Sequence, residues 1–193
     1  MKYAFMTFST PKLTLDENLA LAKQLGYDGI EPRTVCGHAH GVELEASAAD
    51  RKTMKEKAET SGVVLACVAT SLTYADPVSA KTATEETLRY IDLAGDVGAP
   101  CIRVFGGAIP KDVSRERATA ALVSAFRAVA DHAALRGVTV CAETHDDWCN
   151  PDHLAEAMRQ TDHPNIAVNW DIMHPIRQGG ATMDSAFAAL KPW

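Results

Sequence analysis

Two acidic residues and one histidine carry the most chemical information in this sequence. Glu143 closes the apolar stretch VTVCAE, Asp171 closes IAVNWD, and His174 follows three residues later. A carboxylate at the end of an apolar strand costs free energy unless a cation, a hydrogen-bond network or water meets it there. Two carboxylates at matching places in successive strand–helix units therefore indicate one shared pocket, centred on a metal ion.

The elements that must position these residues form a repeat of strand and helix. Strands are predicted over residues 3–10, 28–33, 63–71, 101–107, 138–145 and 166–174. Helix starts are predicted from cap signals such as Thr14 with Glu17, and the remaining starts lie at Ser47, Thr82, Ser114, Asn150 and Met183. Glycines 26, 62, 98 and 137 close the first four helices. Six successive strand–helix units predict a parallel sheet.

The position of the polar residues favours a barrel over a doubly wound sheet. The turn after the first strand, FSTPKLT, contains no glycine, whereas a nucleotide-binding sheet normally has a glycine-rich turn there. Polar residues gather instead at the carboxyl ends of the predicted strands: Glu31, Arg33, Arg103, Glu143, His145 and Asp171. A (β/α)8 barrel keeps its catalytic groups at this end. We therefore predict one TIM-barrel domain over residues 1–193, with about six of the eight units present.

Composition narrows the class of partner and the compartment. The 193 residues carry a formal charge of −6, which disfavours a nucleic-acid partner. No apolar run is long enough to span a membrane, and the N-terminus lacks the apolar core of a signal peptide. Five cysteines without a CxxC pair predict free thiols rather than disulfides or a thiolate zinc site. We therefore expect a cytoplasmic protein.

Three motifs resemble one known family. DGIEPR in the second strand, AETHDDW at the fifth and WDIMHP at the sixth resemble the xylose-isomerase-like barrels, the superfamily of sugar-phosphate isomerases and epimerases. The resemblance extends along all 193 residues, and the last two motifs are specific only when taken together. It implies a TIM barrel with a divalent metal at its mouth and a sugar or sugar-derived small molecule as substrate.

The resemblance also assigns roles to residues. Glu143 and Asp171 match two metal ligands of the family, and His174 matches a histidine that touches substrate hydroxyls. The third and fourth ligands would follow a seventh and an eighth strand, which we expect to lie beyond Trp193. Oxygen ligands with one imidazole suit Mn²⁺, Mg²⁺ or Co²⁺, and Zn²⁺ also fits.

The chemistry of such a site requires a base beside a carbon acid and an electrophile on the carbonyl. We expect Glu143 to bind the metal and move the proton, with His174 as its catalytic neighbour; a structural pair with an arginine is the alternative for Glu143. His145 and His174 would orient substrate hydroxyls or brace a ligand, and a polar turn is the alternative for His145. Glu31 and Arg33 would contact substrate or form an ion pair at the barrel rim.

The other polar and aromatic residues have less specific interpretations. His38 and His40 are expected in a solvated loop. Arg103 would bind a substrate phosphate or form a structural salt bridge. Trp148 and Trp170 are expected in the core, although packing against a sugar face is an alternative.

Three alternative functions follow from the same residues. A dehydratase on the same scaffold shares metal-assisted proton removal, and the sequence does not separate it from an isomerase. The nuclease branch of the superfamily requires histidines after the third and fourth strands, where this sequence has VATSL and VFGGA. A non-catalytic barrel completed by a partner would expose sheet edges, which predicts a homo-oligomer or poor solubility.

Overall fold

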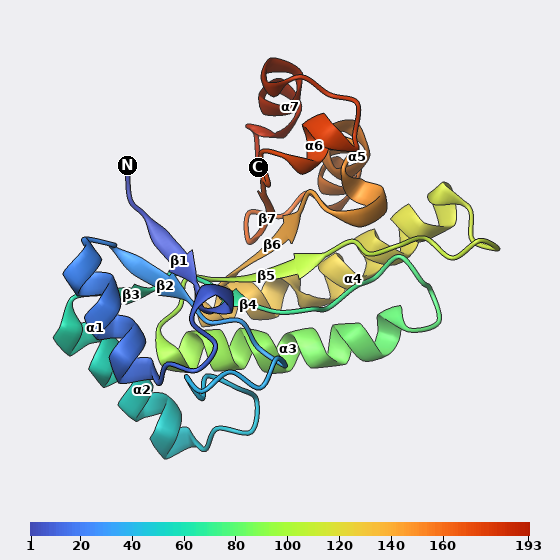
Figure 1. The fold of residues 1–193 in the computed structure, drawn as a ribbon. Helices are drawn as coiled ribbons and strands as arrows, with labels where there is room; N and C mark the ends of the chain where they lie inside the picture. The colour runs from blue at the N-terminus through green and yellow to red at the C-terminus, as the bar shows by residue number, and fades with distance from the viewer. The chain divides into compact units, whose positions relative to one another are not determined.

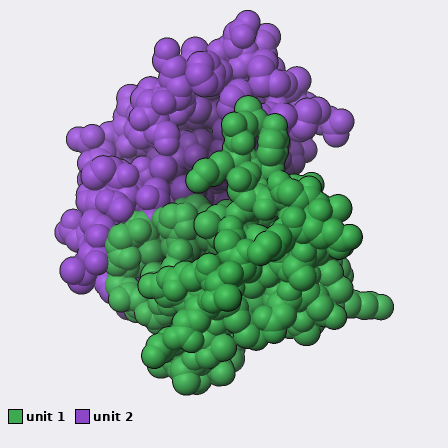
Figure 2. All heavy atoms as spheres, turned by 90° about the vertical axis from the view of Figure 1, so that its left-hand side faces the viewer, with its two compact units in different colours: residues 1–71, 89–102, 136–138 green, residues 72–88, 103–135, 139–193 purple.

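The computed structural model describes all residues 1–193 (Figure 1). The chain groups into two compact units, coloured separately in Figure 2. Unit 1 contains residues 1–71, 89–102 and 136–138, and unit 2 contains residues 72–88, 103–135 and 139–193. The third helix and the fourth predicted strand are each divided between the two units.

Unit 1 contains a three-stranded parallel sheet in the order β1-β2-β3. These strands and the short β4 span Ala4–Met6, Gly29–Glu31, Val64–Leu65 and Val68–Ala69. The strand predicted over residues 63–71 is thus two short strands, β3 and β4. Arg33 forms an isolated parallel bridge with Ala69, so pairing with this segment resumes beyond the end of β2. A short 3-10 helix, η1 (Thr7–Ser9), follows β1.

The first two helices of unit 1 begin and end as their sequences predict. α1 (Leu15–Leu25) and α2 (Ala48–Ser61) each begin with a complete capping box. Each ends at a glycine in the left-handed conformation, Gly26 at φ 77° and Gly62 at φ 74°. A side chain other than glycine rarely adopts this conformation, which explains why glycine ends both helices.

The third helix begins earlier than its sequence suggests. α3 spans Ala80–Val97, two residues ahead of the predicted start at Thr82. The Asp76 carboxylate accepts a hydrogen bond from the Val78 N–H, and the backbone of Ala80 donates to the Asp76 carbonyl. This aspartate therefore starts the chain's turn into the helix, which the threonine–glutamate pair does not.

Unit 2 contains the residues that could bind a metal or take part in catalysis. After β5 (Cys101–Phe105), its elements are α4 (Arg115–Arg136), β6 (Thr139–Glu143), η2 (Asp146–Trp148), α5 (Pro151–Thr161), β7 (Ile166–Asn169), α6 (His174–Arg177) and α7 (Met183–Leu190). The strands follow the sheet order β5-β6-β7. β6 and β7 are parallel, with Glu143 opposite Asn169 at the carboxyl end of the pair. Because parallel strands end at one edge, the segments that follow them start close together.

The core of unit 2 forms along α4 and beneath Trp148. The predicted stripe Ala118, Leu122, Ala125 and Val129 is buried. The Trp148 indole is fully buried as well, and its Nε1 donates to the Gly107 carbonyl at 3.0 Å. Trp148 is thus a core residue, as predicted, whereas Trp170 is only half-buried.

The last predicted strand is shorter than its sequence suggests. β7 ends at Asn169, not at residue 174. The Asp171 Oδ1 atom accepts hydrogen bonds from the backbone N–H groups of Met173 and His174, at 2.7 and 2.9 Å. An aspartate that binds the backbone two and three residues ahead favours a turn over an extended strand. Asp171 therefore ends the extended segment and starts α6.

His40 is buried, which corrects the expectation of a solvated loop. Its side chain is only 3% exposed. Its Nδ1 atom lies 3.0 Å from the Val42 backbone nitrogen and its Nε2 atom 3.1 Å from the Arg33 carbonyl oxygen. Because a backbone N–H donates and a carbonyl accepts, Nδ1 is unprotonated and Nε2 carries the hydrogen. The neutral ring therefore joins two backbone segments of unit 1 by hydrogen bonds. His38, in the same loop, is half-buried.

We expect His40 to make the chain less stable in mild acid. Burial lowers the pKa of His40, an effect that its hydrogen bond to Arg33 opposes and the nearby His38 reinforces. The imidazole therefore binds a proton more weakly in the folded chain than in the unfolded chain. The contribution of neutral His40 to the free energy of unfolding is complete above about pH 6.5 and decreases as the pH falls below that value. The free energy of unfolding, measured with urea between pH 8 and pH 5, should fall less steeply in His40→Gln than in the unchanged chain. Equal slopes would refute this assignment.

No helix is both long and apolar enough to cross a membrane. All five cysteines are free thiols, as predicted; Cys67 and Cys149 are buried and Cys36 is exposed.

Candidate metal centre

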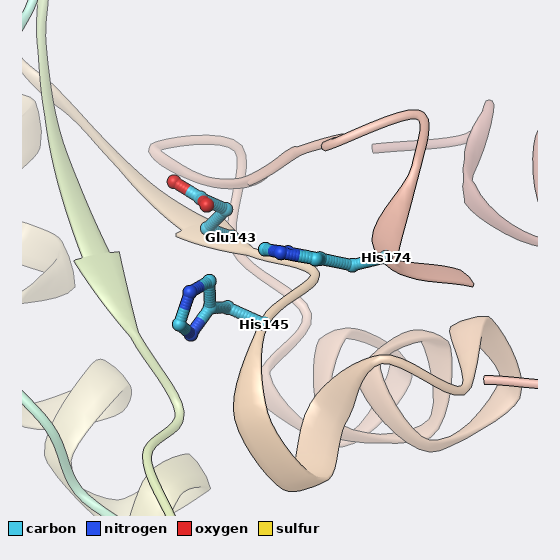
Figure 3. A group of neighbouring side chains, drawn as sticks. All are labelled: Glu143, His145 and His174. Atoms are coloured by element: carbon cyan, nitrogen blue, oxygen red, sulfur yellow. The ribbon is translucent and has the colours of Figure 1, made fainter. Parts of the chain in front are cut away.

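Three side chains with metal-binding atoms converge in unit 2. One ligand atom from each of Glu143, His145 and His174 lies within 4.8 Å of the other two (Figure 3). All three residues are half-buried, so they are shielded from bulk water yet accessible to a small ligand. We refer to them below as the Glu–His–His cluster.

The local sequence explains how these residues meet. Glu143 is the last residue of β6, and His145 lies two residues later, at the start of η2. Residues two apart along an extended segment point to the same side. His174 is the first residue of α6, in the segment after the neighbouring strand β7. The cluster therefore forms because two parallel strands end side by side.

Thr144 fixes the orientation of His174. Its side-chain oxygen accepts a hydrogen bond from the Asp171 backbone N–H at 2.9 Å and donates to the Asp171 carbonyl at 3.1 Å. The Thr144 carbonyl lies 3.1 Å from His174 Nδ1, which must therefore carry the hydrogen. Nε2 of His174 is left with a lone pair, the form that binds a metal or accepts a proton.

Glu143 is paired with a buried arginine. The Arg103 Nε atom lies 3.1 Å from Glu143 Oε2, and the two side chains are only 6% and 12% exposed. The Asn169 side-chain amide donates to the same oxygen at 3.2 Å. One carboxylate oxygen thus receives both contacts.

Aromatic rings link this ion pair to the histidines. The Arg103 guanidinium carbon lies 4.1 Å from the centre of the Phe105 ring. Ring centres are 4.6 Å apart for Phe105 and His145, and 4.5 Å apart for His145 and His174. The imidazoles are therefore held by ring packing, in addition to the hydrogen bond of His174.

Asp171, the second predicted ligand, lies beside the cluster. Its Oδ2 atom is 3.8 Å from His174 Nδ1, while Oδ1 is occupied by the turn into α6. Burial alone would raise the pKa of Asp171, but the N–H groups of His174 and Met173, helped by the imidazoles of His174 and His145, hold it below its usual value. The group is an anion at neutral pH, as a ligand must be.

The surroundings of the cluster are acidic. The thiol of Cys149 has a raised pKa because of burial first, and then because of the negative charges of Asp146, Asp171, Asp147 and Glu143. His145 Nδ1 lies 3.0 Å from Asp146 Oδ1. Several carboxylates around one small region produce a potential that attracts a cation.

The donor set of the cluster fits a divalent ion. A carboxylate with two imidazoles binds zinc, cobalt, iron or manganese, and a second carboxylate shifts the preference toward harder ions. Two ligands that each lie about 2.1 Å from one ion are at most about 4.2 Å apart, so the 4.8 Å limit of the cluster requires only a small adjustment. The residues present therefore suit the metal that the sequence predicts.

Two predicted substrate contacts lie in unit 1. Glu31 is the last residue of β2. The guanidinium of Arg33 donates to the carbonyls of Thr34 and Ala69, both at 3.2 Å, and to the Ser71 hydroxyl. Arg33 thus connects backbone segments within its unit, and its role toward substrate stays a prediction.

The contacts of Thr144 and Asn169 were not predicted from the sequence. Both bond to predicted site residues across the junction of β6 and β7. A threonine directly after Glu143 and an asparagine two residues before Asp171 were the available signals, yet neither residue type is distinctive at such places.

The comparisons with known proteins agree with this geometry. The family model described as xylose isomerase-like TIM barrel matches residues 19–191. The chain belongs to this family. Membership confirms the predicted resemblance and the fold class, with a part of the barrel's units present in the chain. No curated protein matches the chain by sequence.

Several solved structures resemble the chain in fold. A probable 3-DHS dehydratase, AsbF from Bacillus anthracis, has a TM-score of 0.80 and 22% identity, over 100% of this chain and 70% of that one. A D-psicose 3-epimerase, solved with D-fructose, has 0.80 and 17%, over 98% and 69%. The IOLI protein, solved with a zinc atom, has 0.79 and 17%, over 96% and 67%. At these identities the likeness establishes the fold, while activity requires a separate argument.

Proposed function

We propose that this chain belongs to a divalent-metal-dependent isomerase or epimerase, which moves a proton next to the carbonyl of a sugar or sugar derivative. The observation that carries the proposal is the convergence of Glu143, His145 and His174 within 4.8 Å. Their place at the carboxyl ends of parallel strands is the usual position of a TIM-barrel active site. The epimerase among the structural neighbours and the zinc atom in another are consistent with it.

In this proposal Glu143 and Asp171 would hold the metal, and the imidazoles of the cluster lie beside it. When bound there, a divalent cation would supply a Lewis acid for the substrate carbonyl, which would make the neighbouring C–H more acidic. Glu143 also moves the proton, acting as one half of an acid–base pair. His174, whose Nε2 carries the lone pair, accepts a hydrogen bond from a substrate hydroxyl, and His145 orients a second one. We assign Glu31 and Arg33 to substrate contact as well.

A dehydratase is the second candidate, because AsbF is among the solved structures that resemble the chain. Proton removal next to a carbonyl starts both reactions. They differ in the next step, since a dehydratase expels a hydroxyl group and an epimerase returns the proton. The residues of the cluster serve either outcome.

Deuterium exchange tests the proposal directly. The protein is first titrated with Mn²⁺, Co²⁺, Zn²⁺ and Mg²⁺ by calorimetry, and then incubated with ketoses and keto-polyols in D₂O. We expect one cation site and cation-dependent deuterium incorporation at the carbon next to the carbonyl, which EDTA abolishes. Recovery of an isomeric sugar identifies an epimerase or isomerase, and loss of water identifies a dehydratase. The absence of any bound cation would overturn the proposal.

A further inference from the structure

Glu143 is restrained through only one of its two oxygens. Arg103 Nε and the Asn169 amide both approach Oε2, at 3.1 and 3.2 Å. Oε1 accepts no hydrogen bond from another residue in the structure. The carboxylate therefore has one oxygen neutralised by the protein and one oxygen available to a ligand.

Arg103 is held firmly in this position. Its residue is only 5% exposed, and it lies on β5, so its backbone is part of the sheet. Phe105 is two residues later on the same side of the strand, with its ring 4.1 Å from the guanidinium carbon. The cation–π contact and the burial both limit how far the guanidinium can withdraw when another cation arrives.

A fixed positive charge beside a cation site has an unusual consequence. Ligands of a metal are commonly supported by hydrogen-bond acceptors, which make them more basic, and loss of such support weakens metal binding. A guanidinium has the opposite effect, because it makes the carboxylate less basic and also repels the incoming ion. Its presence nevertheless keeps the Glu143 charge compensated before a metal binds, since an unpaired buried carboxylate is costly.

We propose that Arg103 is an internal counterion that competes with the divalent cation for Glu143. It stabilises the site before the cation binds, leaves Oε1 available to the cation, and keeps cation affinity low enough for exchange. Arg103 is thus a positioning residue for Glu143, and this inference depends on the proposed function of the Glu–His–His cluster. If Arg103 only held Glu143 in place, its removal would weaken metal binding. If Arg103 is a competing counterion, its removal strengthens metal binding.

The test compares Mn²⁺ affinity and thermal stability in three proteins. They are the unchanged chain, Arg103→Met, and the control Arg127→Met, which removes an exposed arginine of α4 and so matches the change in net charge. In Arg103→Met we expect Mn²⁺ to bind at least about tenfold more tightly, because the repulsion between a single and a double charge at close range is large even in a polar medium. The metal-free protein should melt at a lower temperature, and Mn²⁺ should raise its melting temperature more than it does in the unchanged chain. The control should leave Mn²⁺ affinity within about threefold.

Equal or weaker Mn²⁺ binding by Arg103→Met would overturn the inference. Absence of Mn²⁺ binding by the unchanged chain would instead refute the proposed function, so the two failures are distinguishable. If Arg103→Met does not fold, the Mn²⁺ affinity of Arg103→Lys tests the inference instead. That variant keeps the positive charge, so we expect its Mn²⁺ affinity to stay within about threefold of the unchanged chain, and a change above tenfold would contradict us.

Discussion

Replacement of Glu143 by glutamine is expected to remove divalent-cation binding almost completely. The substitution keeps the shape of the side chain but removes its negative charge, which the cation and Arg103 both require. Loss of groups that only support a metal ligand already weakens binding by about 10–100-fold. Loss of the ligand itself should exceed this range, and calorimetric titration with Mn²⁺ or Zn²⁺ measures it. Any cation-dependent exchange activity should fall by about 10²–10⁴-fold, the usual contribution of a general acid or base.

The same substitution should also destabilise the fold. Removing one partner of a buried ion pair takes a charged contact from the other, and breaking such pairs costs up to about 3–5 kcal/mol. Glu156→Gln is a suitable control, because Glu156 is an exposed carboxylate of α5 that pairs with Arg159. The control should change neither cation affinity nor stability appreciably. Unchanged Mn²⁺ affinity in Glu143→Gln would show that the metal binds elsewhere.

The residues of the cluster could be predicted because the ends of apolar strands can be recognised in the sequence. VTVCAE and IAVNW alternate or run apolar up to the point where polar residues begin, and parallel strands place these points on one edge. Glu143, His145 and His174 were all expected at the site, and the structure brings them together. Whether they and Asp171 hold a metal stays a prediction.

The contacts that arrange the cluster could be predicted only in part. Arg103 reaches Glu143 from the neighbouring strand. The sequence allowed a salt bridge for Arg103 and an arginine partner for Glu143, but it did not pair the two residues. Thr144 acts through its carbonyl as well as its hydroxyl, and a carbonyl gives no sequence signal. Such contacts depend on strand register and side-chain rotamers, which no pattern of residue types specifies.

Local interactions explain which element boundaries were correct. Capping boxes and left-handed glycines depend on neighbours in sequence, so α1 and α2 were placed well. α3 and β7 deviated because Asp76 and Asp171 bind the backbone ahead of them, and an aspartate in an apolar run has several such uses. His40 was misplaced for another reason: its loop looks polar, yet the chain folds it beneath the Arg33 carbonyl.

Replacement of Trp148 by alanine is expected to destabilise unit 2 strongly. The indole is fully buried, its Nε1 donates to the Gly107 carbonyl, and it lies directly against Gly106. A Cβ atom added at Gly106 would overlap the indole ring, so the two glycines after β5 and the tryptophan after β6 fit one another closely. Large-to-small changes of a buried tryptophan cost about 3–5 kcal/mol, a large fraction of the stability of an ordinary domain.

Urea unfolding of Trp148→Ala, Gly106→Ala and Trp170→Ala separates this packing from a general loss of apolar surface. Trp170 is the matched control, since its side chain is half-buried and should cost clearly less to remove. Gly106→Ala adds one methyl group and should cost about 1–3 kcal/mol through overpacking. Because η2 follows directly after His145, loosening Trp148 should also weaken Mn²⁺ binding at the Glu–His–His cluster. Equal destabilisation by the two tryptophan changes would contradict the close fit, because loss of aromatic surface alone would then explain both.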